Sequence, residues 1–112
     1  MTFTEKPLFQ SQPASTTAAT LYTPSAGVTG LLKSINVANA STASATFSLY
    51  HDIDGLTYNS SSILYPSITV DSLDTLLIEQ FIAINSTASG IGVAVGTANA
   101  LTFSGYGAEV TT

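Results

Sequence analysis

The residues of this chain best suited to binding a metal ion are Asp52 and Asp54, which stand at alternate positions just before Gly55. Carboxylates spaced in this way begin a Ca²⁺-binding loop, where they present oxygen ligands to a hard cation. A complete loop also needs further oxygen ligands and a distal glutamate at a fixed spacing, and this sequence lacks them. We therefore predict a hairpin turn at this point, and no metal or other cofactor.

His51 is the single histidine and the best candidate for a catalytic base, with Asp52 beside it. No serine stands in the G-x-S-x-G context that would make it a nucleophile. The carboxylates of Asp71, Asp74 and Glu79 have the chemistry of a glycosidase, but that reaction takes place in a cleft lined by aromatic side chains. Because the chain has no tryptophan and its tyrosines are scattered, we interpret these acids as turn and rim residues. An enzyme is not predicted.

The composition is that of one small domain with an unusual surface. The chain has 112 residues, enough for a single hydrophobic core. Only 8% of the residues are charged, against about 25% in a typical soluble domain. A surface poor in charge costs little to desolvate, because few ions must give up water. Such a surface is typical of an extracellular or virion β protein, and it also suits a protein whose surface is covered by partners.

The charge balance excludes some classes of partner. The net charge is −5, with two lysines and no arginine. Nucleic-acid binding needs a basic footprint, so that function is excluded, and binding to an anionic membrane is disfavoured for the same reason. The chain has no cysteine, which excludes a disulfide framework and a thiol nucleophile. We also expect no membrane span and no Sec signal peptide, because the necessary apolar and basic stretches are missing.

Residues 31–54 have the pattern of two β-strands joined by a small polar turn. Ile35 and Val37 alternate with small or polar residues, and Phe47 and Leu49 do the same after the turn. Similar short runs stand at near-regular spacing along the chain. They place the expected strands at residues 18–23, 28–38, 45–53, 63–65, 68–70, 75–79, 81–84, 90–96 and 101–110. Residues 75–79 and 81–84 form one strand if the chain only kinks between them. We therefore predict an all-β fold, a β-sandwich of about eight short strands, jelly-roll-like first and immunoglobulin-like second.

The first sixteen residues lack a sustained period, and their two prolines favour extended structure. We predict an extended N-terminal arm at residues 1–16 and a sandwich domain at residues 17–112. Phe3, Leu8 and Phe9 are the apolar anchors by which such an arm would dock on a partner. The alternative is that the arm packs on its own domain.

Glycines gather in the last two expected strands, at Gly90, Gly92, Gly96, Gly105 and Gly107. Glycine costs stability in a strand, because it loses the most conformational entropy and packs nothing. We therefore predict that another part of the structure approaches closely there, either the other sheet of the sandwich or a neighbouring subunit.

Four segments carry a resemblance to a family. TAATLYTP at 17–24, GVT at 27–29, KSINVAN at 33–39 and LTFSGYGAEV at 101–110 form a pattern of strand and turn residues. The pattern resembles small virion proteins of tailed bacteriophages, in particular capsid decoration (cement) proteins. The resemblance covers most of residues 17–112 and carries no catalytic residue. It implies a β-sandwich in a symmetric assembly on the capsid surface, often a homotrimer.

Two functions follow from this resemblance as expectations. The first is a capsid decoration protein, made in the bacterial host cytoplasm and located on the capsid surface of the virion, where it binds the major capsid protein and stabilises contacts between capsomers. The second is a tail or fibre component, either structural or binding a host glycan. The second function predicts that Tyr50, Tyr58 and Tyr65 gather at one end of the sandwich.

Overall fold

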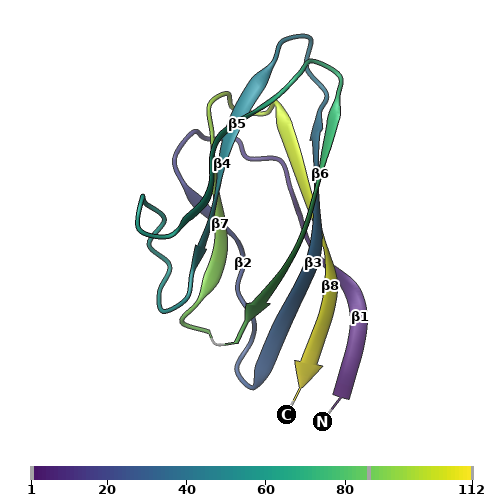
Figure 1. Cartoon of the computed structure of the whole chain (residues 1–112), viewed down its shortest axis with the longest axis vertical. Coiled ribbons are helices and arrows are strands. Elements are labelled where there is room, and N and C mark those ends of the chain that lie inside the picture. The colour runs from purple at the N-terminus through teal and green to yellow at the C-terminus, as the bar shows by residue number, and fades with distance from the viewer. Residues whose placement is uncertain (1, 86, 112) are drawn as a thin grey trace.

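The computed structural model describes residues 2–85 and 87–111, and these form eight β-strands and no helix (Figure 1). The strands are β1 (Thr2–Ser11), β2 (Ala19–Tyr22), β3 (Val28–Asn39), β4 (Ala45–Asp52), β5 (Ile63–Val70), β6 (Thr75–Ile84), β7 (Gly90–Val95) and β8 (Leu101–Thr111). Within the described residues there is thus no helix that could cross a membrane.

The strands form two four-stranded sheets that lie face to face (Figure 1). The first sheet has the order β1-β8-β3-β6 and the second the order β2-β7-β4-β5. Every pairing is antiparallel, and the pairs β1–β8, β2–β7, β3–β6 and β4–β5 join the ends of the chain progressively toward its middle. This is a long hairpin rolled into two sheets, which is the jelly roll. The predicted all-β, jelly-roll-like sandwich is confirmed. The second expectation, an immunoglobulin-like sandwich, does not apply, because that fold divides its strands differently between the two sheets.

The two strands expected within residues 31–54 are β3 and β4, but the expectation that they pair as a central hairpin is wrong, because β3 lies in the first sheet and β4 in the second. Together they supply much of the core. Ile35, Val37, Phe47 and Leu49 all point between the sheets and are fully buried, as their period-2 pattern requires. The rings of Phe47 on β4 and Phe103 on β8 meet edge to face, with their centroids 5.4 Å apart. Since these strands belong to different sheets, the aromatic pair ties the two layers together.

The predicted N-terminal arm is strand β1 of the first sheet. Thr2–Ser11 pairs with β8 along its whole length, so the segment packs on its own domain and residue 16 is not a structural boundary. The side chains of Thr2–Pro7 are all exposed, while Leu8 and Phe9 are half-buried against the core. An edge strand of this kind is held mainly by backbone hydrogen bonds, which any sequence can make. Its side chains therefore need no alternating pattern.

Two of the expected strands differ in length from the structure. The pieces expected at residues 63–65 and 68–70 are one strand, β5, which continues through Pro66. Because β5 is at a sheet edge, the missing N–H of a proline costs little there. The chain kinks at Ser67, whose φ is 46°, and the register with β4 shifts at the same place. β6 is likewise one strand.

A buried asparagine holds the turn that connects β3 of the first sheet to β4 of the second. The side-chain Nδ2 of Asn39 donates to the carbonyl oxygens of Ala43 (2.9 Å) and Val70 (3.0 Å). Its Oδ1 accepts from the backbone N–H and the hydroxyl of Ser41, at 2.9 and 2.7 Å. One side chain thus joins the β3–β4 turn to the end of β5, and it is only 2% exposed.

At the other end of the sandwich a carboxylate bridges the two sheets. Glu109 on β8 accepts a hydrogen bond from the hydroxyl of Tyr22 on β2 (2.6 Å) and forms an ion pair with Lys6 on β1 (3.0 Å). The hydrogen bonds from Tyr22 and Lys6 lower the pKa of Glu109. Burial is the main cause that raises the pKa of Tyr22, and Glu109 adds to it. The tyrosine therefore stays a neutral donor to the ionised glutamate.

Candidate functional site

The residues first considered for chemistry have structural partners. Both carboxylate oxygens of Asp52 accept backbone N–H groups, one from Asp54 (3.2 Å) and one from Thr57 (2.9 Å). These hydrogen bonds are the main cause that lowers the pKa of Asp52. Asp52 therefore orders the β4–β5 loop, as the predicted turn requires. In residues 2–85 and 87–111, no cluster of three or more histidine, cysteine or acidic side chains is suited to a metal ion.

His51 lies at the end of β4, where the sequence predicts it. Its Nε2 is buried and has no hydrogen-bond partner among the described residues. Burial lowers the pKa of this imidazole, and the neighbouring Asp52 opposes the shift. Burial therefore disfavours the charged form of this ring.

Part of the outer face of the second sheet, which is the side turned away from the first sheet, is covered by the chain's own β4–β5 loop. The ring of Tyr58 lies on Gly92 of β7, where a Cβ would come within 2.6 Å of three ring atoms. Its hydroxyl is hydrogen-bonded to the hydroxyl of Thr20 on β2 (2.8 Å), and its ring is 6.0 Å from that of Tyr50. In Figure 1 this loop stands out beside β7 and β4.

The predicted close approach to the glycines is thus internal. Tyr58 covers Gly92, the ring of Phe9 lies on Gly105, and the backbone of Leu31 presses on Gly107. The partners are side chains of the same chain, two of them aromatic rings, and at Gly107 a backbone segment. The opposite sheet of the sandwich, which was one of the two expected causes, does not supply these contacts to Gly92, Gly105 and Gly107.

The outer face of the first sheet has no such cover among the described residues. Its exposed large apolar side chains are Phe3 (56%), Leu77 (56%), Phe81 (62%) and Tyr106 (46%). Phe3 stands opposite Val110, and Tyr106 lies between Pro7 on β1 and Ser34 on β3. Apolar side chains that gather on one face of a small protein commonly mark an interaction site.

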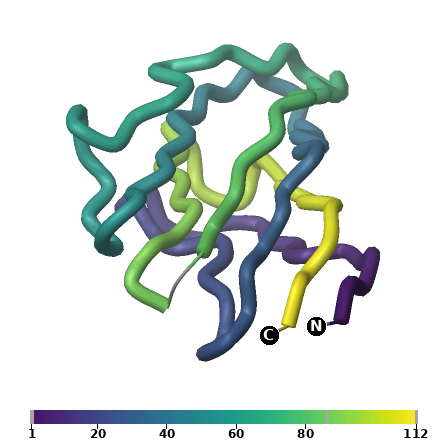
Figure 2. Tube along the Cα trace, turned by 60° about the horizontal axis from the view of Figure 1, so that its bottom comes forward, coloured from purple at the N-terminus to yellow at the C-terminus, as the bar shows by residue number. Residues whose placement is uncertain are grey.

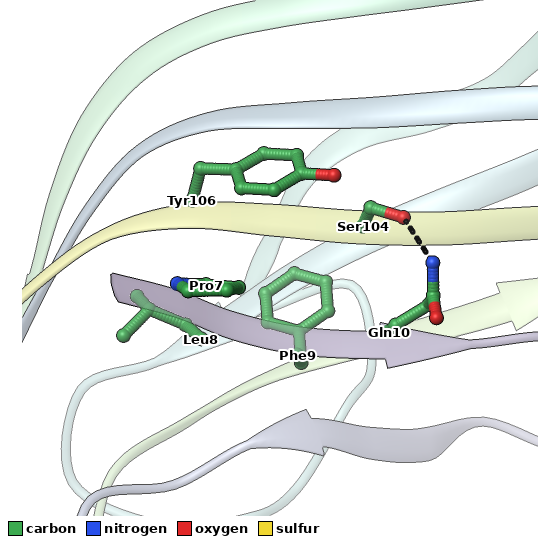
Figure 3. A pocket seen from close by; sticks show the side chains of 6 residues that line it. All are labelled: Pro7, Leu8, Phe9, Gln10, Ser104 and Tyr106. Atoms are coloured by element: carbon green, nitrogen blue, oxygen red, sulfur yellow. Dashed lines mark hydrogen bonds between the residues drawn. The ribbon is translucent and has the colours of Figure 1, made fainter. Parts of the chain in front are cut away.

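A shallow groove of about 380 Å³ crosses β1 and β8 (Figure 3). The register of β1 shifts between Pro7 and Phe9, and this bulge shapes the groove. Its lining residues are Pro7, Leu8, Phe9, Gln10, Ser104 and Tyr106. The Nε2 of Gln10 donates to the hydroxyl of Ser104 at 3.4 Å, which sets a polar pair at one end of an otherwise apolar surface (Figure 3). The groove offers contacts for binding and no reactive group.

The structure separates the three predicted anchors. Phe3 is exposed on the outer face of the first sheet, whereas Leu8 and Phe9 are partly used by the chain's own core. Sequence reasoning missed Leu77, Phe81 and Tyr106 as surface residues. A signal for the first two exists, because Leu76-Leu77 and Phe81-Ile82 are adjacent apolar residues, and a strand sends neighbours to opposite faces.

The tyrosines expected to gather at one end do so only in part. Tyr50 and Tyr58 are neighbours on the second sheet, but the hydroxyl of Tyr65 donates to Oε1 of Gln80 on β6, between the sheets.

Comparison with known proteins adds no relative to this description. The sequence matches no protein-family model, and no curated protein matches it significantly.

Proposed function

We propose that this protein is a bacteriophage capsid decoration protein, which binds the major capsid protein on the surface of the assembled virion and stabilises contacts between neighbouring capsomers. The observation that carries the proposal is the exposed apolar outer face of the first sheet, with Phe3, Phe81 and Tyr106. The jelly roll, which recurs in viral capsid and lectin domains, supports it. The sequence resemblance to decoration proteins supports it as well, and it implies a homotrimer.

The low charge of the chain suits this role. Few ions must lose water when the first sheet docks, so a modest apolar area is enough to hold the contact. A protein that binds only the assembled capsid stabilises that state by mass action. The structural consequence is a capsid that resists heating or dilution better when it is decorated.

Copy number in purified virions tests the proposal. Quantitative mass spectrometry compares this chain with the major capsid protein in particles of a phage that encodes it. A ratio near one to one, or a simple fraction of it, is expected for a protein that decorates the whole lattice. A ratio far lower would place the protein in the tail or a fibre, which is the alternative function, and absence from the particle would refute both.

A binding experiment then tests the surface. Capsids lacking this protein are mixed with the wild-type chain or with Tyr106→Ala, and bound protein is measured after sedimentation. Weaker binding of the variant is expected, because its side chain is exposed and its loss leaves the core intact. Thr69→Ala is the matched control, since Thr69 is an exposed residue of the second sheet. Equal binding of all three proteins would exclude the outer face of the first sheet.

A further inference from the structure

The two sheets have four edge strands, and three of them are protected against pairing with another strand. Unpaired N–H and C=O groups at an edge attract further strands, and proteins prevent this with proline, lysine, bulges or short strands. β1 has Lys6, Pro7 and a bulge, and β5 has Pro66 with the kink at Ser67. β2 has only four residues and a register shift.

The fourth edge, β6, has none of the protecting residues, although its register with β3 shifts between Leu32 and Ser34. Its ten residues include no proline, glycine or lysine, and their burial alternates without a break. Figure 2 shows β6 (green) beside β3 (blue), and no strand of the described chain pairs with its other side. Its outward side chains include Leu77 and Phe81, and Glu79 is its only charge. This edge is long and carries exposed apolar side chains, a combination that favours pairing with another strand.

We propose that β6 pairs with β6 of a second copy of this chain, antiparallel and about a two-fold axis, so that two first sheets become one continuous sheet. The pairing satisfies both open edges at once and leaves no new one, as a closed two-fold interface does. A strand from a different protein would cover β6 but bring a further edge of its own.

The sequence of β6 allows such a pairing in one favourable register. With Gln80 opposite Gln80, the two amides meet on the inner side of the joined sheet, where each Oε1 already accepts from the hydroxyl of Tyr65 and each Nε2 can still donate. Each Ile78 then stands opposite Ile82 of the other copy, and each Leu77 stands opposite Ala83 of the other copy. The two Glu79 carboxylates lie on a diagonal, so the direct opposition of like charges is avoided. This pairing does not rest on the proposed function. If the chain also forms a trimer through another surface, the β6 pairing is a separate two-fold contact.

The test compares two double variants by light scattering after size-exclusion chromatography. Leu77→Lys with Phe81→Lys gives β6 the charges that protect other edges. Phe3→Lys with Tyr106→Lys changes the same outer face by the same charge, away from β6. All four side chains are exposed, so both variants should fold, which circular dichroism checks. The wild-type mass is expected to be an even multiple of 11.5 kDa, to halve in the β6 variant and to stay unchanged in the other.

Amide hydrogen exchange gives a second readout. In the pair, the β6 amides that point away from β3 become protected, and in the β6 variant they exchange fast. A wild-type mass of one or three chains overturns the proposal, as does a mass that both variants lower or neither lowers. A monomer whose β6 variant alone loses capsid binding assigns the edge to the capsid protein and also overturns it. Absence from virions, with the mass still halving, refutes the proposed function and leaves the pairing intact.

Discussion

Replacing Asn39 by alanine is expected to weaken the whole sandwich, although the residue lies in a turn. The side chain makes four hydrogen bonds, and the one to the carbonyl of Val70 is buried. Alanine offers nothing to that carbonyl, and water has little access to it at a position that is 2% exposed. The variant therefore loses both the bonds and the solvation that would replace them.

The size of the loss follows from this arrangement. A buried carbonyl without a donor costs about 2 kcal/mol, and the three more accessible hydrogen bonds together contribute about 1 kcal/mol. The free energy of unfolding should therefore fall by about 3 kcal/mol, a large part of the roughly 5–15 kcal/mol that holds a typical domain. For a chain of this length the melting temperature should fall by about 12 °C.

Asn59→Ala is the matched control for this prediction. Asn59 has the same local turn, because its Oδ1 accepts from the backbone N–H and the hydroxyl of Ser61, but it is exposed. Its loss should cost less than about 1 kcal/mol. Urea denaturation of both variants at one protein concentration gives the two values. If Asn39→Ala costs no more than Asn59→Ala, the buried hydrogen bond to Val70 does not stabilise the fold as argued.

Two further predictions concern the loop and the ion pair. Gly92→Ala should lower the free energy of unfolding by about 1–3 kcal/mol, because the new Cβ meets the ring of Tyr58. The same substitution should cost much less in a Tyr58→Ala background, which a double-mutant cycle measured by urea denaturation tests. Glu109 has a lowered pKa in the folded state, so its contribution is present above the ordinary glutamate value of about 4.3 and is lost as the pH falls through the lower folded value. Glu109→Gln should therefore lose less stability than the wild type when urea midpoints are compared between neutral and acidic pH. An equal loss in both proteins would show that this carboxylate does not contribute.

The strands β3 and β4 are predictable from sequence because their inner faces are buried along their length, but the sequence pattern does not tell that they lie in different sheets and do not pair as a hairpin. Ile35, Val37, Phe47 and Leu49 can point inward only in one register, and a slip by one residue would send them all to solvent. The sandwich follows from turns at regular spacing, whereas the expected count of about eight strands agrees with the structure only because the division of β5 into two pieces offset the missing β1.

β1 is not predictable in the same way, because its evidence lies in the backbone. Thr2–Pro7 bury no side chain, and their pairing with β8 uses backbone C=O groups and, except at Pro7, backbone N–H groups, which need no side-chain pattern. The cover of the second sheet is hidden for a different reason. Gly92 signals a close approach, but the sequence does not say that the ring of Tyr58, from a loop, fills the space.

The candidate site is harder to predict than the fold, since it consists of apolar side chains that are not buried in the core. Phe3 could be named, because an aromatic residue in a pattern-free segment has no obvious core position. Leu77 and Phe81 are placed on the outside only by the register of β6 with β3, in which Ile78 stands opposite Ile35 and takes the inner side. A pattern of adjacent apolar residues indicates two apolar faces but does not tell which one is buried.

The face and the edge of the first sheet can bind different partners at once. Side chains such as Phe3 and Tyr106 project perpendicular to the sheet, whereas the free backbone groups of β6 lie in its plane. If both the capsid binding and the β6 pairing hold, a two-fold pair of chains presents two outer faces of the first sheet at a fixed distance from each other. Its second contact with a capsid is then intramolecular, and such avidity adds about 10²–10⁴ in affinity only where two sites have the matching spacing. Free capsid subunits lack that spacing and an assembled lattice repeats it, which gives a physical reason why this protein would discriminate between them.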